Sequence, residues 1–208
     1  MIDPFQFHAQ TRVIPVVVIN DESDAAPLAE ALKAAGLPSA EVTLRTPAAL
    51  AALRIMAEDP EFMVGAGTVT RPEQVELAAF AGARYIVSPG FSADVVRSCQ
   101  IGGLPVLPGI ATATELQQAT IWGLGHVKFF PAAAAGGVAM IKALSAPFPD
   151  VRFVPTGGVS LDSMADYLAV PSVLAIGGSW MVSQDLIARR EFGRITELAA
   201  EAVELATR

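Results

Sequence analysis

The sequence predicts a single α/β domain, residues 1–208, that folds as a (β/α)8 TIM barrel of eight parallel strands with an N-terminal helix. Short β-rich runs alternate with longer segments rich in Ala, Leu and Glu at a spacing of about 20 to 25 residues, which is typical of repeated βα units. Eight alternations without a shift in composition favour a closed barrel, because an open doubly wound sheet usually has about five to seven strands. In addition, Gly or Pro follows nearly every expected strand.

The expected strands are short runs in which Val, Ile and other apolar residues dominate, bounded by Gly, Pro or polar residues. They are Val13–Ile19, Ala40–Leu44, Met63–Val69, Arg84–Ser88, Leu104–Pro108, His126–Phe130, Val151–Pro155 and Val173–Ile176. In a (β/α)8 barrel the loops that follow the strands form the functional face. Motifs at the carboxyl ends of these runs are therefore read as functional.

Helices are expected where good helix formers repeat with apolar residues three and four positions apart. They are Asp24–Ala35, Pro47–Glu58, Pro72–Ala81, Ala93–Gln100, Ala113–Trp122, Gly137–Leu144, Leu161–Leu168 and the closing helix Phe192–Ala206. Residues Asp3–Arg12 form a short N-terminal helix or a mobile arm, and nothing in them, His8 included, suggests chemistry.

Composition excludes several classes of partner. The net charge of −7 and the lack of any basic run argue against nucleic acid, so an anionic substrate must be held locally by backbone amides and one or two arginines. Charged residues make up only 17%, which predicts that identical subunits cover part of the surface. No apolar run approaches the roughly 20 residues needed to cross a bilayer.

The single cysteine, Cys99, excludes an internal disulfide and a cysteine-based metal cluster. Together with an N-terminus that has no signal-peptide pattern, it predicts a cytoplasmic protein. The two histidines lie far apart and no carboxylate cluster sits at adjacent strand ends, so the sequence predicts no metal and argues against a metal-dependent mechanism.

Lys128 is the residue that points most strongly to chemistry. It is one of three lysines and the only one in an apolar, strand-like run, whereas Lys33 and Lys142 lie on amphipathic helices from which an ammonium reaches water. Burial beside aromatic residues disfavours the charged form of an amine. A neutral amine is a nucleophile, so Lys128 is expected to attack a ketone and form a Schiff base.

Period-two alternation along the second strand places Glu41, Thr43 and Arg45 on one side and the apolar Val42 and Leu44 on the other. The polar side is expected to face the lumen, as is Lys128 on the sixth strand by the same test. A buried Glu–Arg bridge of purely structural value is the alternative, but an acid and a lysine that meet in one cavity favour acid–base chemistry. His126, near the start of its strand, is expected to be structural.

The loops after the last two strands predict a phosphate site, since glycines let backbone N–H groups approach an anion. These loops contain Thr156, Gly157, Gly158, Gly178 and Ser179. Thr68, at the end of the third strand, either donates to a substrate oxygen or satisfies its own loop. Gly136 and Gly137, which open the helix after Lys128, have a weaker claim to an anion.

Several motifs together resemble the 2-keto-3-deoxy-6-phosphogluconate (KDPG) and 4-hydroxy-2-oxoglutarate (KHG) aldolase family, from about Val13 to the last helix. The motifs are Glu41–Thr46, Val64–Val69, Ser88–Gly90, Pro108–Ile110, Lys128–Ala132, Phe153–Gly158 and Ile176–Trp180. One stretch departs from the family pattern, because Ala132–Ala135 stands where a Glu and an Asn are common. This departure concerns the contacts to the aldehyde half of the substrate.

The resemblance implies a homotrimeric class I aldolase without a cofactor. It implies cleavage of 2-dehydro-3-deoxy-6-phosphogluconate to pyruvate and glyceraldehyde 3-phosphate, with 4-hydroxy-2-oxoglutarate as a further substrate. Lys128 matches the Schiff-base lysine and Glu41 the acid–base group. Arg45 and Thr68 match carboxylate contacts, and the remaining substrate-binding positions are Pro89, Phe130, Thr156, Gly157, Gly158, Gly178 and Ser179.

Three alternatives stay open at the level of sequence. An aldolase for the galactonate epimer differs only in stereochemistry at C4. A phosphate-binding isomerase or epimerase fits the last two loops equally well but has no need of an imine-forming lysine. A non-catalytic phosphosugar-binding module would bury the charged groups of Glu41, Arg45 and Lys128, and it would have no catalytic use for them to offset the free-energy cost of desolvation.

Overall fold

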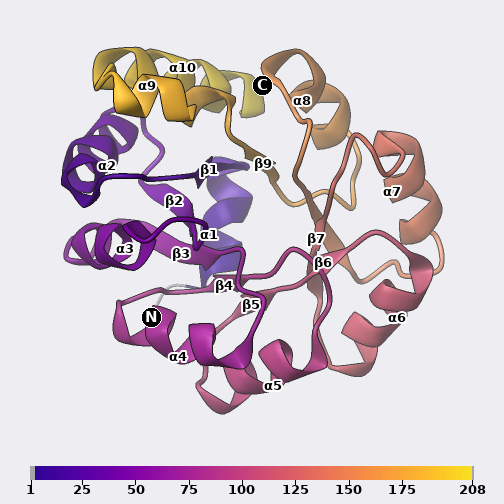
Figure 1. Cartoon of the computed structure of the whole chain (residues 1–208). Helices are drawn as coiled ribbons and strands as arrows, with labels where there is room; N and C mark the ends of the chain where they lie inside the picture. Colours follow the sequence, from indigo (N-terminus) through magenta and orange to yellow (C-terminus); the bar gives the residue numbers. More distant parts are fainter. Residues whose placement is uncertain (1–2, 208) are drawn as a thin grey trace.

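Parallel strands alternate with helices along the chain in the computed structural model, which describes residues 3–207 (Figure 1). The strands are β1 Val13–Val17, β2 Ser39–Thr43, β3 Met63–Gly67, β4 Ile86–Val87, β5 Val106–Leu107, β6 Gly109–Ile110, β7 His126–Phe129, β8 Arg152–Pro155 and β9 Ile176–Gly178. The helices are α1 Pro4–Thr11, α2 Ala25–Ala34, α3 Ala49–Ala57, α4 Pro72–Phe80, α5 Ala93–Ile101, α6 Ala113–Ile121, α7 Gly137–Ser145, α8 Leu161–Leu168, α9 Gln184–Ala188 and α10 Phe192–Ala206. Two 3₁₀ turns, η1 Glu22–Asp24 and η2 Trp180–Val182, precede α2 and α9.

The strands close into a barrel with eight positions. One sheet runs β5-β4-β3-β2-β1-β9 and the other β6-β7-β8, all pairs being parallel. β5 and β6 are two halves of one strand interrupted by Pro108, the first half pairing with β4 and the second with β7. Bridges from Phe153 to Val173 and from Thr156 to Gly177 join β8 to the last strand position. The predicted barrel is thus confirmed, and so is its N-terminal helix.

The structure corrects several predicted strand bounds. The fifth strand continues past Pro108 to Ile110, whereas the prediction ended it at Pro108. The last strand is Ile176–Gly178 rather than Val173–Ile176, because the glycines read as a loop still pair with β1. β2 ends at Thr43, before the predicted end at Leu44.

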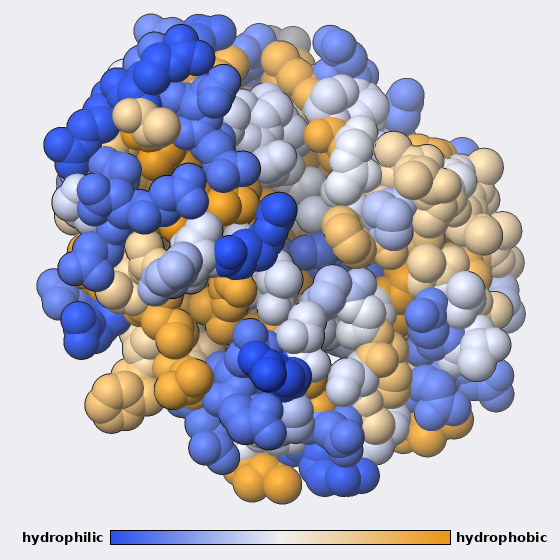
Figure 2. Space-filling view, viewed as in Figure 1, coloured by the Kyte–Doolittle hydropathy of each residue, from blue (hydrophilic) through white to orange (hydrophobic). Residues whose placement is uncertain are grey.

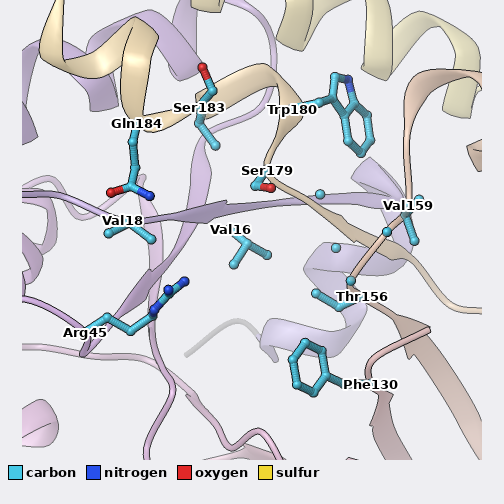
Figure 3. A pocket seen from close by; sticks show the side chains of 15 residues that line it. Val16, Val18, Arg45, Phe130, Thr156, Val159, Ser179, Trp180, Ser183 and Gln184 are labelled. Atoms are coloured by element: carbon cyan, nitrogen blue, oxygen red, sulfur yellow. The ribbon is translucent and has the colours of Figure 1, made fainter. Parts of the chain in front are cut away.

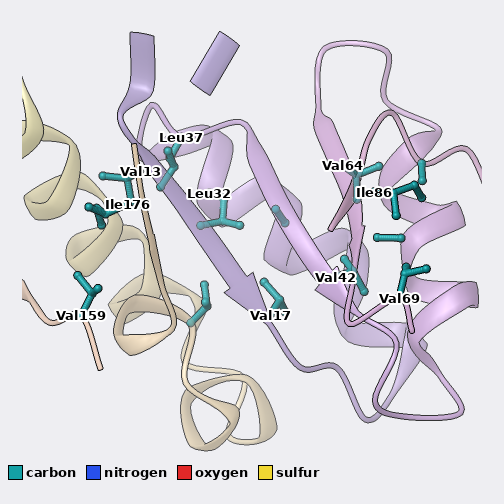
Figure 4. Packing of buried hydrophobic residues seen from close by; sticks show 14 of the residues in the cluster. Val13, Val17, Leu32, Leu37, Val42, Val64, Val69, Ile86, Val159 and Ile176 are labelled. Carbon is teal, nitrogen blue, oxygen red and sulfur yellow. The ribbon is translucent and has the colours of Figure 1, made fainter. Parts of the chain in front are cut away.

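Apolar side chains fill two separate regions. Outward side chains of the strands, such as Val17 and Val42, pack against helix residues such as Leu32 to form the larger core (Figure 4). A smaller cluster occupies the lower part of the barrel interior; it consists of Ile14, Met63, Tyr85, Val87, Leu107, Val154 and Ala175. The lumen is therefore filled rather than open, which leaves its chemistry to the upper part.

Helix α1 covers the amino-terminal end of the barrel. The Phe5 ring stacks on His126, the first residue of β7, with centroids 4.3 Å apart, and the His8 ring meets Tyr85 edge-on at 5.1 Å. Phe5 and Phe7 also pack against the interior cluster. His8 and His126 are thus packing residues at the end away from the functional loops, as the sequence predicted.

None of the helices within residues 3–207 has both the length and the apolar character that crossing a bilayer requires.

Candidate active site

The barrel interior contains a buried ion pair. Lys128 Nζ, on β7, donates to Glu41 Oε1, on β2, across 3.0 Å, and the two side chains are only 7% and 3% exposed. Their neighbours Val42, Val127 and Phe129 face outward into the larger core, so the alternation predicted for both strands is confirmed. An acid and an amine in direct contact, almost free of water, can exchange a proton without solvent.

Two glycines on β3 make room for this arrangement. A Cβ on Gly67 would lie 2.3 Å from Glu41 Oε1, and one on Gly65 would lie 2.3 Å from the ring of Tyr85. Gly65 is the register partner of Glu41, so Tyr85 fills the space just below the carboxylate. Burial raises the pKa of the Tyr85 phenol, the charge of Glu41 raises it further, and its hydroxyl donates to the carbonyl of Ala40 at 3.4 Å.

A cavity of about 430 Å³ opens above the ion pair at the carboxyl ends of the strands (Figure 3). The face seen in Figure 2 is hollowed near its centre, with hydrophilic and near-neutral residues around the hollow. Seven of the predicted substrate-binding residues line the cavity: Arg45, Phe130, Thr156, Gly157, Gly158, Gly178 and Ser179. Phe130 connects the two parts of the site, because Lys128 Nζ lies 5.4 Å from the centre of its ring.

The loops after β8 and β9 form one wall of the cavity. Gly157 and Gly158 have φ of +94° and +76°, which few other residues adopt, and the backbone N–H of Gly158 has no acceptor among residues 3–207. Gly178 ends β9 at a point where a Cβ would overlap the ring of Trp180. The hydroxyl of Ser179 is likewise without a partner in the described chain. Free donors beside glycines are typical of an anion site.

Arg45 was predicted to point into the lumen, but it does not. β2 ends at Thr43, so Arg45 lies in the following turn, is exposed, and lines the cavity from its mouth. Thr43 does face inward, but its hydroxyl is used by a 2.8 Å hydrogen bond to the carbonyl of Val17. Arg45 therefore lines the predicted cavity, but from its mouth rather than from inside the barrel.

Thr68 and Pro89 lie beside the cavity without lining it. Thr68 follows β3 with a φ of +58°, rare for a β-branched residue, and its hydroxyl has no hydrogen-bond partner among the described residues. Such local strain is typical of functional sites. The carbonyl oxygen of Pro89 packs against Gly109, the register partner of Lys128, where an added Cβ would approach it to 2.2 Å.

Several cavity residues were missed from sequence. Ser183 lies between η2 and α9, Gln184 is the first residue of α9, and Val16 and Val18 come from the end of β1. Ser183 is a helix N-cap residue that accepts from the backbone N–H of Leu186 at 3.4 Å, but a capping pattern in the sequence places neither residue at a cavity. No pattern in the sequence indicates that Val16 faces a cavity.

Within residues 3–207 no three His, Cys, Asp or Glu side chains gather closely enough to hold a metal ion. The chemistry available from the described residues is that of an amine, a carboxylate, one exposed guanidinium and a row of backbone donors. This set suits a substrate with a carbonyl near Lys128 and an anionic group at the glycine loops.

Comparison with known proteins identifies relatives over nearly the whole chain. A family profile described as KDPG and KHG aldolase matches residues 6–198. The chain is 47% identical to the 2-dehydro-3-deoxy-phosphogluconate aldolase of Treponema pallidum over 99% of its length and 98% of the relative's. It is also 47% identical to the KHG/KDPG aldolase of Escherichia coli K12, covering 92% and 91% of the two chains.

Solved structures agree with this result. KDPG aldolase of Legionella pneumophila, crystallised with pyruvate captured as a covalent carbinolamine, superposes with a TM-score of 0.93 at 44% identity, covering 96% of this chain and 97% of that one. The Zymomonas mobilis enzyme with 3-phosphoglycerate gives 0.90 at 43% identity, covering 96% and 94%.

Proposed function

The chain belongs to the KDPG and KHG aldolase family, and from this premise we infer that it is a class I aldehyde-lyase acting on 2-dehydro-3-deoxy-6-phosphogluconate. Its products are pyruvate and D-glyceraldehyde 3-phosphate. The observation that carries this conclusion is the buried contact of Lys128 with Glu41 below a cavity with free backbone donors. A relative that captures pyruvate as a carbinolamine supports the same imine chemistry.

In the proposed mechanism Lys128 gives a proton to Glu41 and attacks the C2 carbonyl as a neutral amine. The direct 3.0 Å contact supports this transfer, since no water has to carry the proton. Glu41 returns this proton to the oxygen to give the carbinolamine, then relays a second proton from Nζ to the same oxygen, which leaves as water while an iminium forms between C2 and Nζ. Phe130 excludes water from one side of the amine.

Cleavage uses the same two groups. Glu41, directly or through a water, removes the proton of the C4 hydroxyl. The C3–C4 electron pair moves into the iminium, glyceraldehyde 3-phosphate leaves, and an enamine of pyruvate remains on Lys128. Protonation at C3 and hydrolysis of the iminium release pyruvate and restore the amine.

The two ends of the substrate have different partners in this proposal. Arg45 and Thr68 bind the carboxylate, and Pro89 and Phe130 border the pyruvyl group. Thr156, Gly157, Gly158, Gly178 and Ser179 receive the phosphate. This division is supported by two features of the cavity. Arg45 is the only charged residue among the described residues that line it, and the uncharged glycine loops form a separate part of its wall.

Cleavage of 4-hydroxy-2-oxoglutarate to pyruvate and glyoxylate is a second candidate activity. The relative in Escherichia coli is named a KHG/KDPG aldolase and is 47% identical to this chain. Both substrates carry a C2 ketone and a C4 hydroxyl, so the same lysine and glutamate serve both.

Borohydride reduction in the presence of pyruvate and EDTA, followed by intact-mass and peptide mass spectrometry, tests the proposal. We expect one pyruvate adduct per chain, on Lys128, and none in Lys128→Ala. Aldolase activity retained in Lys128→Ala would end the imine mechanism, and activity lost to EDTA without an adduct would mean a metal-dependent enzyme. Parallel assays with the gluconate and galactonate epimers determine the preference at C4.

We further propose that the chain is one domain and assembles as a homotrimer in the cytoplasm. Large apolar side chains at the ends of α4 and α5, Phe80 at 91% exposure and Ile101 at 82%, support burial by other copies. The buried free thiol of Cys99 is typical of a reducing compartment. Native mass spectrometry should give three times the 21.7 kDa chain mass, and cell fractionation should recover the enzyme with cytoplasmic markers.

A further inference from the structure

Gln184 is the first residue of α9, and its side chain extends into the cavity from the segment that follows the last strand (Figure 3). The N-cap hydroxyl of Ser183 fixes the start of this helix and thereby the direction of the next side chain. Gln184 is exposed to the cavity mouth rather than packed in a core. It therefore needs no rearrangement to meet a bound molecule.

The amide group of Gln184 is oriented by a neighbour. Asn20 Nδ2 donates to Gln184 Oε1 over 3.5 Å, which turns Gln184 Nε2 toward the cavity, as Figure 3 shows. No residue in the described part of the chain accepts a hydrogen bond from Nε2. An oriented donor of this kind is complementary to a hydroxyl or anionic oxygen of a ligand.

The surroundings of Gln184 indicate which part of a ligand it meets. Val16, Val18 and Val182 offer no polar group along this side of the cavity, and Arg45 is the only charged residue among the described residues that line it. The glycine loops serve a terminal phosphate. A hydroxyl group between the reacting carbons and the phosphate would otherwise face valine side chains, which cannot replace its hydrogen bonds to water.

We propose that Gln184 is a specificity-determining substrate contact whose Nε2 donates to the C5 hydroxyl oxygen of the sugar acid, with Asn20 as the residue that positions its amide. This inference rests on the proposed aldolase function and assigns to Gln184 the aldehyde half of the substrate. Gln184 belongs to the same chain segment as Ser179 and the phosphate wall, five residues further on, which favours the aldehyde half over the pyruvyl half.

The test runs the reaction in the synthetic direction with two aldehydes. D-glyceraldehyde 3-phosphate carries the hydroxyl that becomes the C5 hydroxyl, whereas 3-phosphooxypropanal keeps the aldehyde, the chain length and the phosphate but has no hydroxyl. For Gln184→Ala we expect kcat/KM with glyceraldehyde 3-phosphate to fall about three- to tenfold, the effect of one lost neutral hydrogen bond. The value with 3-phosphooxypropanal should stay within about twofold of wild type.

Further variants sharpen the result. Gln184→Glu replaces the donor with a carboxylate near a phosphate dianion and should lose more than Gln184→Ala with both aldehydes. Asn20→Ala should lose less than Gln184→Ala and show the same dependence on the hydroxyl, which a merely structural role would not produce. Asp185→Asn is the matched control, because Asp185 is the next residue of α9, is 85% exposed and does not line the cavity.

Pyruvate trapping with borohydride and exchange of the pyruvate C3 protons separate this inference from the proposed function. Both should be unchanged in Gln184→Ala. Equal losses with the two aldehydes, slower pyruvate exchange, or no loss at all would overturn the role of Gln184 while leaving the aldolase intact. A wild-type protein that forms no pyruvate adduct would overturn both.

Discussion

At the scale of single residues, the site depends on a carboxylate that is kept close to an amine and away from water. Glu41 has 3% of its side chain exposed, and Lys128 supplies its direct partner at 3.0 Å. A buried pair of this kind contributes little net stability, since desolvation offsets the attraction. Its benefit is chemical, because the carboxylate is preorganised to move protons to and from the atoms bonded to Lys128.

Replacing Glu41 by Gln is therefore expected to reduce kcat by about 10² to 10⁴ while the barrel stays folded. The amide has the same shape and still accepts a hydrogen bond from Lys128, but it cannot take a proton. Steady-state cleavage assays and circular dichroism check the two halves of this prediction. Glu58→Gln, an exposed position on the outer surface, is the control, and a near-normal kcat in Glu41→Gln would refute the role of the carboxylate.

His8 predicts an acid-sensitive stability. Burial lowers the pKa of this imidazole from 6.5 to about 3, and neither ring nitrogen has a hydrogen-bond partner in residues 3–207. His8 becomes protonated below about pH 6.5 in the unfolded chain, but only near pH 3 in the folded chain. Stability from this group is thus present above pH 6.5 and is lost as the pH falls.

The expected loss from His8 is about 2 kcal/mol of unfolding free energy between pH 7 and pH 5. His8→Phe keeps an aromatic ring against Tyr85 and removes the titrating group, so it should flatten the stability profile over this range. Urea denaturation at several pH values measures the difference between the two proteins. If the two proteins lose unfolding free energy equally as the pH falls, His8 is not the group responsible for the acid sensitivity.

The pairing of Lys128 with Glu41 could be predicted because strand alternation is strict wherever a strand continues. Arg45 shows the limit of that reasoning. It continues the alternation in the sequence, yet the strand has already ended at Thr43, and beyond a strand end the alternation no longer fixes the direction of a side chain. Gln184 could not be found at all, since an exposed polar residue on a short helix resembles any surface position.

At the scale of elements, β3 shapes the site because its glycines have no side chains. Gly65 and Gly67 face the lumen two residues apart, and each leaves the space that a side chain from a neighbouring strand occupies. The upper space holds the Glu41 carboxylate and the lower one the Tyr85 ring. The same substitution at the two positions should therefore have different consequences.

Gly67→Ala should reduce kcat by about 10²-fold with little change in Tm, because the new Cβ displaces the flexible end of Glu41 from Lys128. Gly65→Ala should instead cost about 1 to 3 kcal/mol of stability, since the Tyr85 ring is fully buried and cannot move aside. Kinetic assays and thermal unfolding of both variants distinguish these outcomes. Gly125→Ala, where a Cβ would meet no atom within 4 Å, is the control, and equal effects at the two sites would contradict this division.

The order and type of the elements could be predicted from the sequence, whereas some boundaries could not. Pro108 was predicted to end the fifth strand. Its carbonyl nevertheless accepts from the N–H of Lys128 at 2.9 Å, so the strand passes from pairing with β4 to pairing with β7. Gly177 and Gly178 were predicted to lie in the loop after the last strand, but their backbone pairs with β1.

At the scale of the whole molecule, the barrel has an open end and a closed end. The carboxyl ends of the strands surround the cavity, while α1 covers the amino ends and packs Phe5 and Phe7 against the interior cluster. This separation lets the upper lumen hold charged groups, because the apolar cluster below them excludes water. The N-terminal helix is therefore expected to contribute to stability more than to chemistry.

Removing residues 1–11 tests whether the N-terminal helix contributes to stability rather than to catalysis. The truncation exposes Tyr85 and the lower cluster and removes the contacts of two phenylalanines, which should cost at least about 3 kcal/mol. At this chain length the loss corresponds to a fall in Tm of roughly 6 to 12 °C. Calorimetry measures the fall, and Phe5→Ala, which removes only the ring stacked on His126, should show a smaller one.

Pyruvate trapping below the new Tm should remain at the wild-type level in the truncated chain, since Lys128 and Glu41 are held by β7 and β2 rather than by α1. An unchanged Tm would mean that α1 does not seal the barrel. Loss of trapping at a temperature where the chain is still folded would mean that water enters through the open lower end and reaches the ion pair, so that the helix supports the chemistry as well as the fold.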